Sequence, residues 1–174
     1  MKLRMLEKRD AIYMLEWMHD ESVVGELHTN FAEKTLKDCQ DFIIASKQKQ
    51  ENWHMAIVDD DDIYMGTVSL KHINQNKGIA EFAITIRRKA MAHGYAAFGM
   101  AEILKKGFDE LGLRNIYWCV SKKNVRAIRF YDKNGYKKTK NVPECMLNLY
   151  KLENENMYWY VISKVKMCTD KGGK

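Results

Sequence analysis

The sequence predicts an α/β fold, with a mixed, mostly antiparallel sheet of six to seven strands and helices on both faces. Residues 53–86 contain three apolar runs separated by two short polar turns, which is typical of an antiparallel meander. Residues 79–121 then run strand, helix, strand, an order that favours a parallel crossover. Residues 136–139 and 158–164 add two final strands.

One strand and three helical segments precede the meander. Ile12 and Leu15 lie at helical spacing in the first helix. Thr35 followed by Asp38 resembles a capping box, in which each side chain bonds to the other residue's backbone amide. The expected ranges are residues 3–6 for the strand and residues 11–18, 22–27 and 35–47 for the helical segments.

The meander contains an acidic turn. Its three strands are expected at residues 53–58, 64–73 and 79–86. Four consecutive acids, Asp59 to Asp62, connect the first two strands. We interpret them as a solvated hairpin tip, because no glycine is interspersed among them as in a calcium-binding loop.

The last part of the chain combines two helices with three strands. The first of these helices has the clearest apolar face, with Met100, Ile103, Leu104 and Phe108 at helical spacing. The second stops at Gly135, in the position where a glycine commonly ends a helix. The expected ranges are residues 96–111 and 124–134 for the helices and residues 115–121, 136–139 and 158–164 for the strands.

Length and composition indicate one globular domain, residues 1–174. The chain is 46% hydrophobic and 30% charged, which is ordinary for such a domain. No run approaches the roughly 18 apolar residues of a membrane span. We therefore expect a cytoplasmic protein with no membrane partner. The four cysteines are scattered and the five histidines show no metal-ligand spacing, so we expect no metal site.

The net charge of +6 is divided unevenly along the chain. Residues 1–86 carry ten Lys or Arg against fifteen Asp or Glu, whereas residues 87–174 carry nineteen against eight. The basic half could therefore steer a polyanionic ligand. Because the basic residues are dispersed rather than gathered in one run with aromatic residues, the pattern argues against nucleic acid as the partner.

A loop of small residues separates the third meander strand from the long helix. It reads His93-Gly94-Tyr95-Ala96. Such a loop exposes backbone N–H groups at a helix N-terminus, where the bare amides and the helix dipole both favour an anion. The sequence therefore predicts a diphosphate site. One helix later, Tyr131 supplies a hydroxyl that can donate a proton.

Two motifs follow this loop, Asn124-x-x-Ala127-x-x-Phe130-Tyr131 and Asn134-Gly135-Tyr136. With Glu81-Phe82 opening the central strand, they resemble the GNAT superfamily of acetyl-CoA-dependent N-acetyltransferases. Within it, they are most similar to the group of ribosomal-protein alanine, spermidine and amino-sugar N-acetyltransferases. The resemblance covers nearly the whole chain in element order. It implies the GNAT fold, acetyl-CoA (coenzyme A) as the cofactor, and a cofactor-binding core at about residues 79–136.

The loop departs from the superfamily pattern at its start. That pattern reads Arg or Gln, two residues, Gly, one residue, then Gly or Ala. Gly94 and Ala96 match it, but Met91 stands at the first position and Ala92 where an extra glycine is frequent. The backbone amides of the loop would still serve the diphosphate. Candidate replacements for the missing charge are Arg87, Arg88 and Lys89.

The resemblance also implies roles for particular residues. Residues 83–86 would form a splayed strand whose backbone pairs with the pantetheine arm, which the Asn124 side chain would also hold. The Tyr131 phenol would protonate the departing thiolate, and general acid catalysis of this kind contributes about 10²–10⁴-fold. The cofactor-binding residues implied in this way are Ala83, Ile84, Thr85, Ile86, Met91, Ala92, His93, Gly94, Tyr95, Ala96, Asn124, Arg126, Ala127 and Tyr131.

Glu81 is the candidate catalytic base. A carboxylate at the edge of the strand could take the proton of an amine directly or through water. It could equally bind a cationic substrate or lie on the surface. Cys119 stands where some relatives carry a glutamate, and we interpret it as a packing residue. No cysteine is paired with a histidine, so we expect direct attack in a ternary complex rather than an acyl-cysteine.

The resemblance places the acceptor site between the first two helices, the loop that joins them and the C-terminal strands. Acids there would suit an amine, and aromatic rings could stack on a sugar. We therefore expect an N-acetyltransferase that acts on a primary amine of a small molecule or amino sugar. A protein N-terminus as acceptor, a non-catalytic acyl-CoA-binding module and a homodimer all stay open. The candidate residues are Trp17, His19, Asp20, Glu21, Glu26, His28 and Phe31, with Tyr158 and Tyr160 opposite.

Overall fold

The computed structural model describes residues 1–27, 30–48, 51–151 and 153–164, and these form the predicted α/β sheet with helices on both faces. The seven strands lie in the order β1-β2-β3-β4-β5-β7-β6, and every neighbouring pair is antiparallel except β4 and β5. The strands are β1 (Lys2–Met5), β2 (Trp53–Val58), β3 (Tyr64–Asn74), β4 (Ile79–Ile86), β5 (Asn115–Ser121), β6 (Lys137–Thr139) and β7 (Met157–Ser163).

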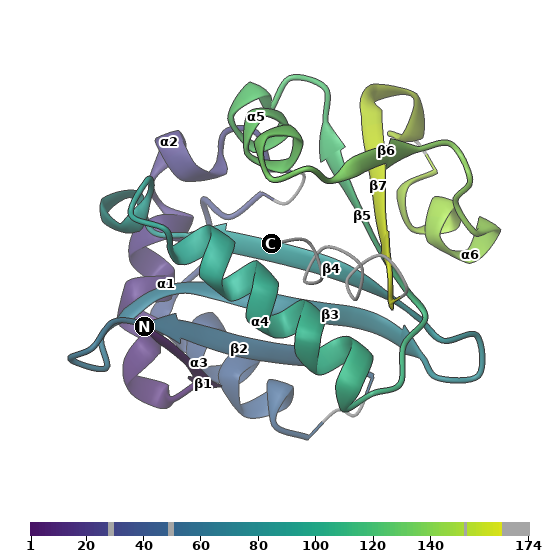
Figure 1. Ribbon diagram of the computed structural model, residues 1–174. Helices are drawn as coiled ribbons and strands as arrows, with labels where there is room; N and C mark the ends of the chain where they lie inside the picture. Colours follow the sequence, from purple (N-terminus) through teal and green to yellow (C-terminus); the bar gives the residue numbers. More distant parts are fainter. Residues whose placement is uncertain (28–29, 49–50, 152, 165–174) are drawn as a thin grey trace, which may run out of the picture.

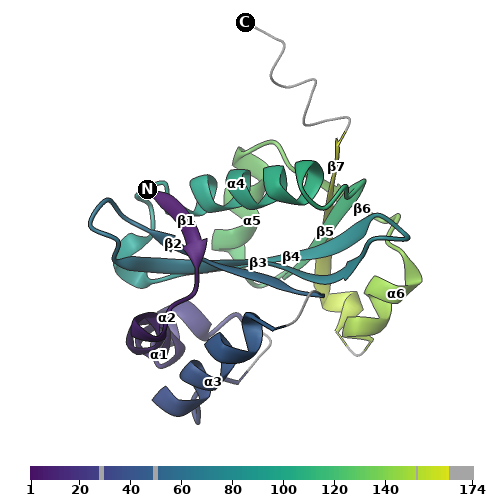
Figure 2. The same ribbon diagram turned by 90° about the horizontal axis from the view of Figure 1, so that it is seen from below.

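Helices cover the sheet from two sides. Figure 2 shows α4 on one face and α1, α3 and α6 on the other. None of the helices within the described ranges is long and apolar enough to cross a membrane. The α-helices of these ranges are α1 (Ala11–Met18), α2 (Glu21–Val24), α3 (Leu36–Ser46), α4 (Tyr95–Asp109), α5 (Val125–Lys133) and α6 (Glu144–Leu147). Short 3₁₀ helices occur at Lys8–Asp10, Arg88–Ala90, Asn148–Tyr150 and Asn154–Asn156.

Local signals in the sequence explain most of the element boundaries. The bounds of α1, β2, β4 and β5 agree with the predicted ranges residue for residue. The predicted capping box of α3 is present, since Thr35 N donates to Asp38 Oδ2 over 2.8 Å and Asp38 N donates to Thr35 Oγ1 over 3.2 Å. The sequence did not predict α6 or the 3₁₀ turns that follow it, because a four-residue helix is too short to show periodicity.

The main core lies between α4 and the sheet. Met100, Ile103 and Phe108 of α4 are fully or almost fully buried there. Gly107 lets the helix approach closely, because a Cβ atom at that position would lie 2.9 Å from the Cδ1 atoms of both Leu70 and Ile116. The predicted apolar face therefore faces the sheet, as its periodicity required.

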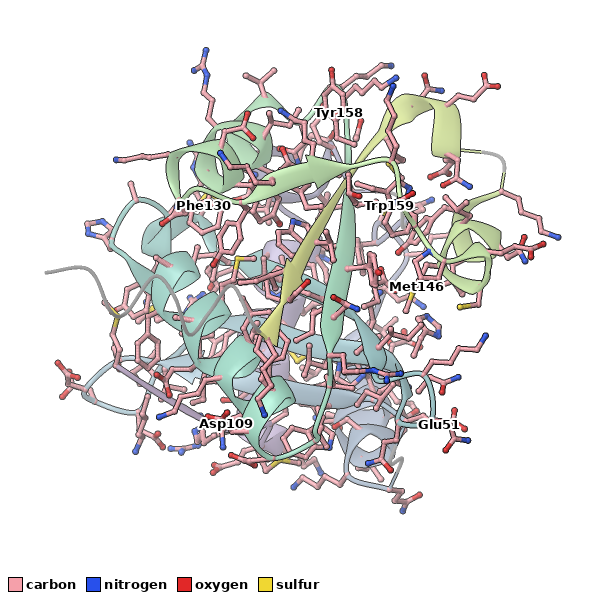
Figure 3. All side chains as sticks on the ribbon, turned by 45° about the vertical axis from the view of Figure 1, so that its right-hand side comes forward. Glu51, Asp109, Phe130, Met146, Tyr158 and Trp159 are labelled. Atoms are coloured by element: carbon pink, nitrogen blue, oxygen red, sulfur yellow. The ribbon has the colours of Figure 1, made fainter. Side chains whose placement is uncertain are left out.

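Two smaller cores lie on the opposite face. One packs α1 and α3 against the sheet around residues such as Trp17, Ile43 and Tyr64. The other lies under α6 and includes Met146 and Trp159, which Figure 3 labels. The second of these cores fixes the segment between β6 and β7 against the sheet.

The parallel pair β4–β5 is joined along only part of its length. Its register covers three pairs, from Ile79 opposite Asn115 to Glu81 opposite Tyr117. Beyond them β5 continues beside β7 and leaves the last five residues of β4, 82–86, with no strand partner on that edge. Figure 1 shows the two strands splaying apart toward α5. The splay expected at residues 83–86 is therefore present, and it opens the sheet beside the N-terminus of α4.

Candidate functional site

A cavity of about 520 Å³ lies where β4 and β5 separate, and we call it the donor cavity. The free edge of β4, the loop before α4 and one face of α5 form its walls. Unpaired backbone N–H and C=O groups on a strand edge are ready to bond to an extended ligand. The lining residues are Val23, Leu27, Ile84, Thr85, Ile86, Ala90, Met91, Ala92, Gly94, Ala96, Ala97, Asn124, Arg126, Ala127, Phe130, Tyr131, Lys133 and Asn134.

The loop before α4 presents backbone donors to this cavity. Gly94 caps the helix with φ of 86°, and Ala92 also adopts a left-handed φ of 63°. The first N–H groups of α4 have no acceptor within the helix, and the helix dipole adds positive potential at the same point. These exposed amides lie where the sequence predicts a diphosphate site, although the first residue of the loop is Met91.

The charge beside this loop comes from Arg126 on α5. Its Nη1 atom lies 3.1 Å from the carbonyl oxygen of Ser22 and 3.2 Å from the sulfur of Met91. The guanidinium therefore stands against the residue that replaces the usual Arg or Gln.

Arg87, one of the three candidates for this charge, is held elsewhere. Its side chain is buried, forms an ion pair with Glu16 and donates from Nη1 to the carbonyl oxygen of Tyr64 over 2.8 Å. The guanidinium also lies 4.3 Å from the ring centre of Tyr13. Arg87 is thus wrong as a diphosphate contact, because it joins the end of β4 to α1. Lys89 lines a separate hollow. The hydrogen bond from the Ser22 hydroxyl lowers the pKa of the Asp20 carboxyl group, and the nearby charge of Arg88 adds to this effect.

Eleven of the fourteen predicted cofactor residues line the donor cavity. Ala83 does not, because alternate residues of a strand face opposite sides of the sheet and Ala83 lines a cavity on the other face. His93 and Tyr95 line the hollow that also contains Lys89. The sequence analysis missed Val23, Leu27, Ala90, Ala97, Phe130, Lys133 and Asn134, of which Phe130 and Asn134 belong to the motifs that it singled out.

Tyr131 lines the donor cavity from within the core. Its ring centre lies 5.1 Å from that of Tyr160 and 5.4 Å from that of Trp118. Burial raises the pKa of the Tyr131 phenol above its ordinary value, and the neighbouring Tyr160 and Cys119 add to the effect. The group therefore carries its proton at neutral pH.

Asn124 serves the local structure as well as the cavity. Its Oδ1 accepts from the backbone N–H of Ala127 over 3.0 Å, so the residue caps α5. Asparagine favours this position because a side-chain oxygen satisfies an N–H group that the helix leaves unpaired. The cap fixes the direction of the side chain at the cavity wall.

Glu81 lies in a buried cluster rather than on a surface edge. Its side chain is only 3% exposed. Its Oε1 accepts from the Tyr150 hydroxyl over 2.5 Å and lies 3.3 Å from Lys71 Nζ, while Oε2 lies 3.6 Å from His72 Nε2. Oε2 has no hydrogen-bond donor among the described residues. The sequence did not point to Tyr150, which belongs to the segment around α6 and comes to Glu81 only through the fold.

Cys119 lies beside the same cluster. Burial, with the charge of Glu81, raises the pKa of its thiol to about 12. It packs at the margin of the core under α6. The interpretation of Cys119 as a packing residue agrees with this position, since a thiol that resists ionisation is a weak base and nucleophile.

A second cavity, of about 360 Å³, lies on the opposite face of the sheet between β4, α1 and α3, and we call it the acceptor cavity. It shares Ile84 and Thr85 with the donor cavity, so the two meet at the free edge of β4. The lining residues are Met14, Trp17, Met18, Phe31, Lys34, Asp38, Cys39, Phe42, His54, Thr67, Ser69, Lys71, Ala83, Ile84 and Thr85.

Two of the predicted acceptor residues meet in this cavity. The rings of Trp17 and Phe31 pack edge to face with centres 5.2 Å apart. Trp17 is held in place because its Nε1 donates to the Tyr64 hydroxyl over 3.0 Å. The cavity is also lined by Asp38, Phe42, His54 and Lys71, which no sequence motif singles out and which lie on a predicted helix and two predicted strands.

The other predicted acceptor residues lie elsewhere. Glu21 and His19 line a neighbouring hollow, and Glu26 is exposed and lines neither cavity. The Asp20 side chain caps α2 by accepting a hydrogen bond from the backbone N–H of Ser22. The placement of two tyrosines opposite this site was wrong: Tyr158 is exposed, and Tyr160 is buried in the core on the α4 face. His28 lies outside the described residues.

Comparisons with known proteins agree with this architecture. A family model described as "Acetyltransferase (GNAT) domain" matches residues 1–137. An "Uncharacterized N-acetyltransferase p20" from Bacillus licheniformis is 26% identical over 141 residues, which are 78% of either chain. The spermidine N-acetyltransferase from Vibrio cholerae in complex with CoA and spermine is similar with a TM-score of 0.78, at 19% identity over 95% of this chain and 96% of that one. A structure described as a probable acetyltransferase has a TM-score of 0.76 at 15% identity, over 94% and 93% of the two chains. At these identities the structural likeness shows the fold alone.

Proposed function

The chain belongs to the GNAT acetyltransferase family, and we propose that it transfers the acetyl group of acetyl-CoA to the primary amine of a small molecule by direct attack. The meeting of the donor and acceptor cavities at Ile84 and Thr85 carries this proposal. A donor on one side of the β4 edge and an acceptor on the other would bring their reacting atoms together without a covalent enzyme intermediate.

The residues of the donor cavity fit acetyl-CoA. The free edge of β4 can pair with the amide groups of a pantetheine arm, and the loop at Gly94 can hold the diphosphate. Arg126 and Lys133 add positive charge along the same wall. Acetyl-CoA supplies a thioester, whose carbonyl carbon is open to an amine.

Three steps of the reaction fall to residues of this chain. The backbone N–H groups of β4 beyond Glu81 are positioned to polarise the carbonyl that is attacked. Tyr131, whose raised pKa keeps its proton on the phenol, would give that proton to the departing sulfur. The amine must lose a proton in exchange, and Glu81 is our candidate base. Glu81 does not line the acceptor cavity, whereas Lys71, its ion-pair partner, does, so Glu81 would take the proton of the amine through water.

The known relatives are consistent with an amine acceptor. The solved structure from Vibrio cholerae is that of a spermidine N-acetyltransferase with spermine bound. A protein N-terminus is the competing acceptor, and the intact mass of a candidate partner protein, increased by one acetyl group, would reveal it. Acetylation of partner proteins without acetylation of any free amine would contradict the small-molecule proposal.

Substitution of Tyr131 tests the proposed chemistry. We expect Tyr131→Phe to lower kcat at least about tenfold, because the leaving thiolate loses its acid, and to leave the affinity for acetyl-CoA similar. Steady-state kinetics and calorimetric titration with acetyl-CoA would measure the two effects.

Tyr136→Phe is the matched control. Its ring centre lies 6.3 Å from that of Tyr131, but it does not line the donor cavity. Full activity in Tyr131→Phe, or an equal loss in Tyr136→Phe, would contradict the assigned role.

A further inference from the structure

The walls of the acceptor cavity are mostly apolar. Met14, Trp17 and Met18 come from α1, and Phe42 from α3. Phe31, which lies before α3, adds an aromatic ring that packs against Trp17. Aromatic and thioether side chains of this kind bind apolar groups through burial and favourable ring contacts. The cavity is therefore suited to an acceptor with an apolar body.

Several of the polar side chains in this cavity already have partners within the protein. His54 Nδ1 and Ser69 Oγ are 2.8 Å apart, and Thr67 Oγ1 lies 2.7 Å from the Tyr64 hydroxyl. Asp38 Oδ2 accepts from both the backbone amide and the hydroxyl of the residue that caps α3, over 2.8 and 2.6 Å. A ring with many hydroxyl groups needs unengaged partners when it leaves water, and this cavity offers few.

The charges around the cavity leave no surplus of negative charge. Lys34 and Lys71 line it, and Asp38 is its one lining acid among the described residues. The Oε1 atom of Glu81, which does not line the cavity, lies 3.3 Å from Lys71 Nζ and offsets the charge of Lys71. Burial and the charge of Lys71 lower the pKa of His54 to about 4, so this ring is neutral at pH 7. A polyamine, which carries several positive charges, would find only the Asp38 carboxylate to pair with among the described lining residues.

We infer that the acceptor is a monoamine with an apolar, aromatic body, and that polyamines and amino sugars are poor substrates. The inference rests on the proposed function and names the substrate class of the same site. The single amine would reach the free edge of β4 at Ile84 and Thr85, while its apolar body packs against Trp17, Phe31 and Phe42. An amine in such a neutral, apolar cavity is also more easily deprotonated than in water, as attack on a thioester requires.

A panel of amines tests this inference on the full chain with acetyl-CoA. The probes are 2-phenylethylamine, spermidine and glucosamine, and the readout is kcat/KM from the acetylated product measured by mass spectrometry. We expect kcat/KM for 2-phenylethylamine to exceed those for spermidine and glucosamine by roughly tenfold or more. A higher value for spermidine or glucosamine would overturn the inference and leave the proposed function standing. If none of the three is acetylated while acetyl-CoA still binds, the proposed function falls, and the inference with it.

A charged variant of the wall gives a second, independent test. Phe42→Glu places a carboxylate on the cavity wall, and Ile44→Glu places the same charge on the same helix at an exposed residue outside the cavity. We compare kcat/KM for spermidine with kcat/KM for 2-phenylethylamine. We expect Phe42→Glu to raise the ratio of the first to the second roughly tenfold, and Ile44→Glu to leave this ratio unchanged. An unchanged ratio in Phe42→Glu, or an equal shift in both variants, would overturn the inference.

Discussion

Arg126 places a positive charge beside a loop whose own motif lacks one. The loop offers Met91 where the superfamily carries Arg or Gln, and Arg126 approaches the same point from α5. Its second contact, to the carbonyl of Ser22, also joins α5 to α2. A cation held in this way beside the loop amides would strengthen the hold on a diphosphate.

Removing that charge should weaken cofactor binding. We expect Arg126→Gln to raise the Kd for acetyl-CoA roughly tenfold, which corresponds to the loss of about one charge-assisted hydrogen bond. Arg129→Gln is the matched control, because Arg129 is exposed on the same helix and does not line the donor cavity. Calorimetric titration would measure both, and equal affinities in the two variants would contradict the role of Arg126.

His54 links the acceptor cavity to the pH dependence of stability. Burial, with the charge of Lys71, lowers its pKa to about 4, whereas an unfolded histidine titrates near pH ~6.5. Between these two values the unfolded chain binds the proton more readily than the folded protein. Stability therefore rises with pH in this window, and it is lost as the pH falls from about 6.5 toward 4.

The wild type should thus lose more stability on acidification than a variant without this ring. We expect the additional loss between pH 7 and pH 5 to be about 1–2 kcal/mol relative to His54→Gln, after allowance for partial exposure of the ring. Urea denaturation at both pH values would measure it. His93→Gln, at an exposed histidine, should keep the wild-type dependence. If His54→Gln lost as much stability as the wild type between pH 7 and pH 5, the assignment of this pH dependence to His54 would be contradicted.

At the scale of elements, the free edge of β4 is the central feature. The partner strand β3 holds β4 on its other side, and Gly66 of β3 allows them to lie close together. A Cβ atom at Gly66 would be 2.5 Å from the carbonyl oxygen of Thr85 and 3.2 Å from the Cα atom of Ile86. Both are backbone atoms, which cannot move aside as the end of a long side chain can. The close contact with β3 therefore fixes the position of the β4 backbone at Thr85 and Ile86, which line the donor cavity.

Gly66→Ala should disturb both the fold and the donor cavity. We expect a loss of about 1–3 kcal/mol in stability from overpacking, together with a higher KM for acetyl-CoA because Thr85 and Ile86 line the cavity. Denaturant unfolding and steady-state kinetics would measure these effects. Gly112→Ala is the control. A Cβ atom at Gly112 would have no neighbour within 4 Å, but the residue has a φ of 64°, which strains an alanine. This variant should therefore lose stability without a change in KM. An unaltered KM in Gly66→Ala would contradict the argument.

At the scale of the whole molecule, the distribution of charge favours the binding of an anion. The C-terminal half carries most of the positive charge, and it contains the loop, α4 and α5. The same half contributes Arg126 and Lys133 to the donor cavity. A field of one sign around a concave site raises the local concentration of a ligand with the opposite sign.

The affinity for acetyl-CoA should therefore depend on salt. We expect the Kd to rise about three- to tenfold between 0.05 and 0.5 M KCl, because added salt shortens the range over which exposed charges act. Titrations at several salt concentrations would measure this. A Kd independent of salt would show that backbone contacts alone hold the cofactor.

The sequence could predict most of the fold because its signals are local. Periodicity, turn residues and the Thr35 capping box each act over a few neighbouring residues, and the elements that they predict are present. It could also predict most of the donor wall, because the loop and the motif around Asn124 lie on adjacent elements. The segment around α6 gave no such signal, and the placement of Tyr158 and Tyr160 opposite the acceptor site failed for lack of the sheet register.

The sequence by itself thus determined the order and type of the elements, the loop at Gly94 and the position of Asn124 and Tyr131 on one helix and its cap. Only the tertiary structure decided that Arg126 rather than Arg87 stands beside the loop, that Glu81 is buried under Tyr150, and which side chains line the acceptor cavity. The physical reason is that these features join residues far apart in the chain. Whether an arginine or a carboxylate meets solvent, an ion-pair partner or a cavity depends on how distant strands and helices pack, and no short window of sequence contains that information.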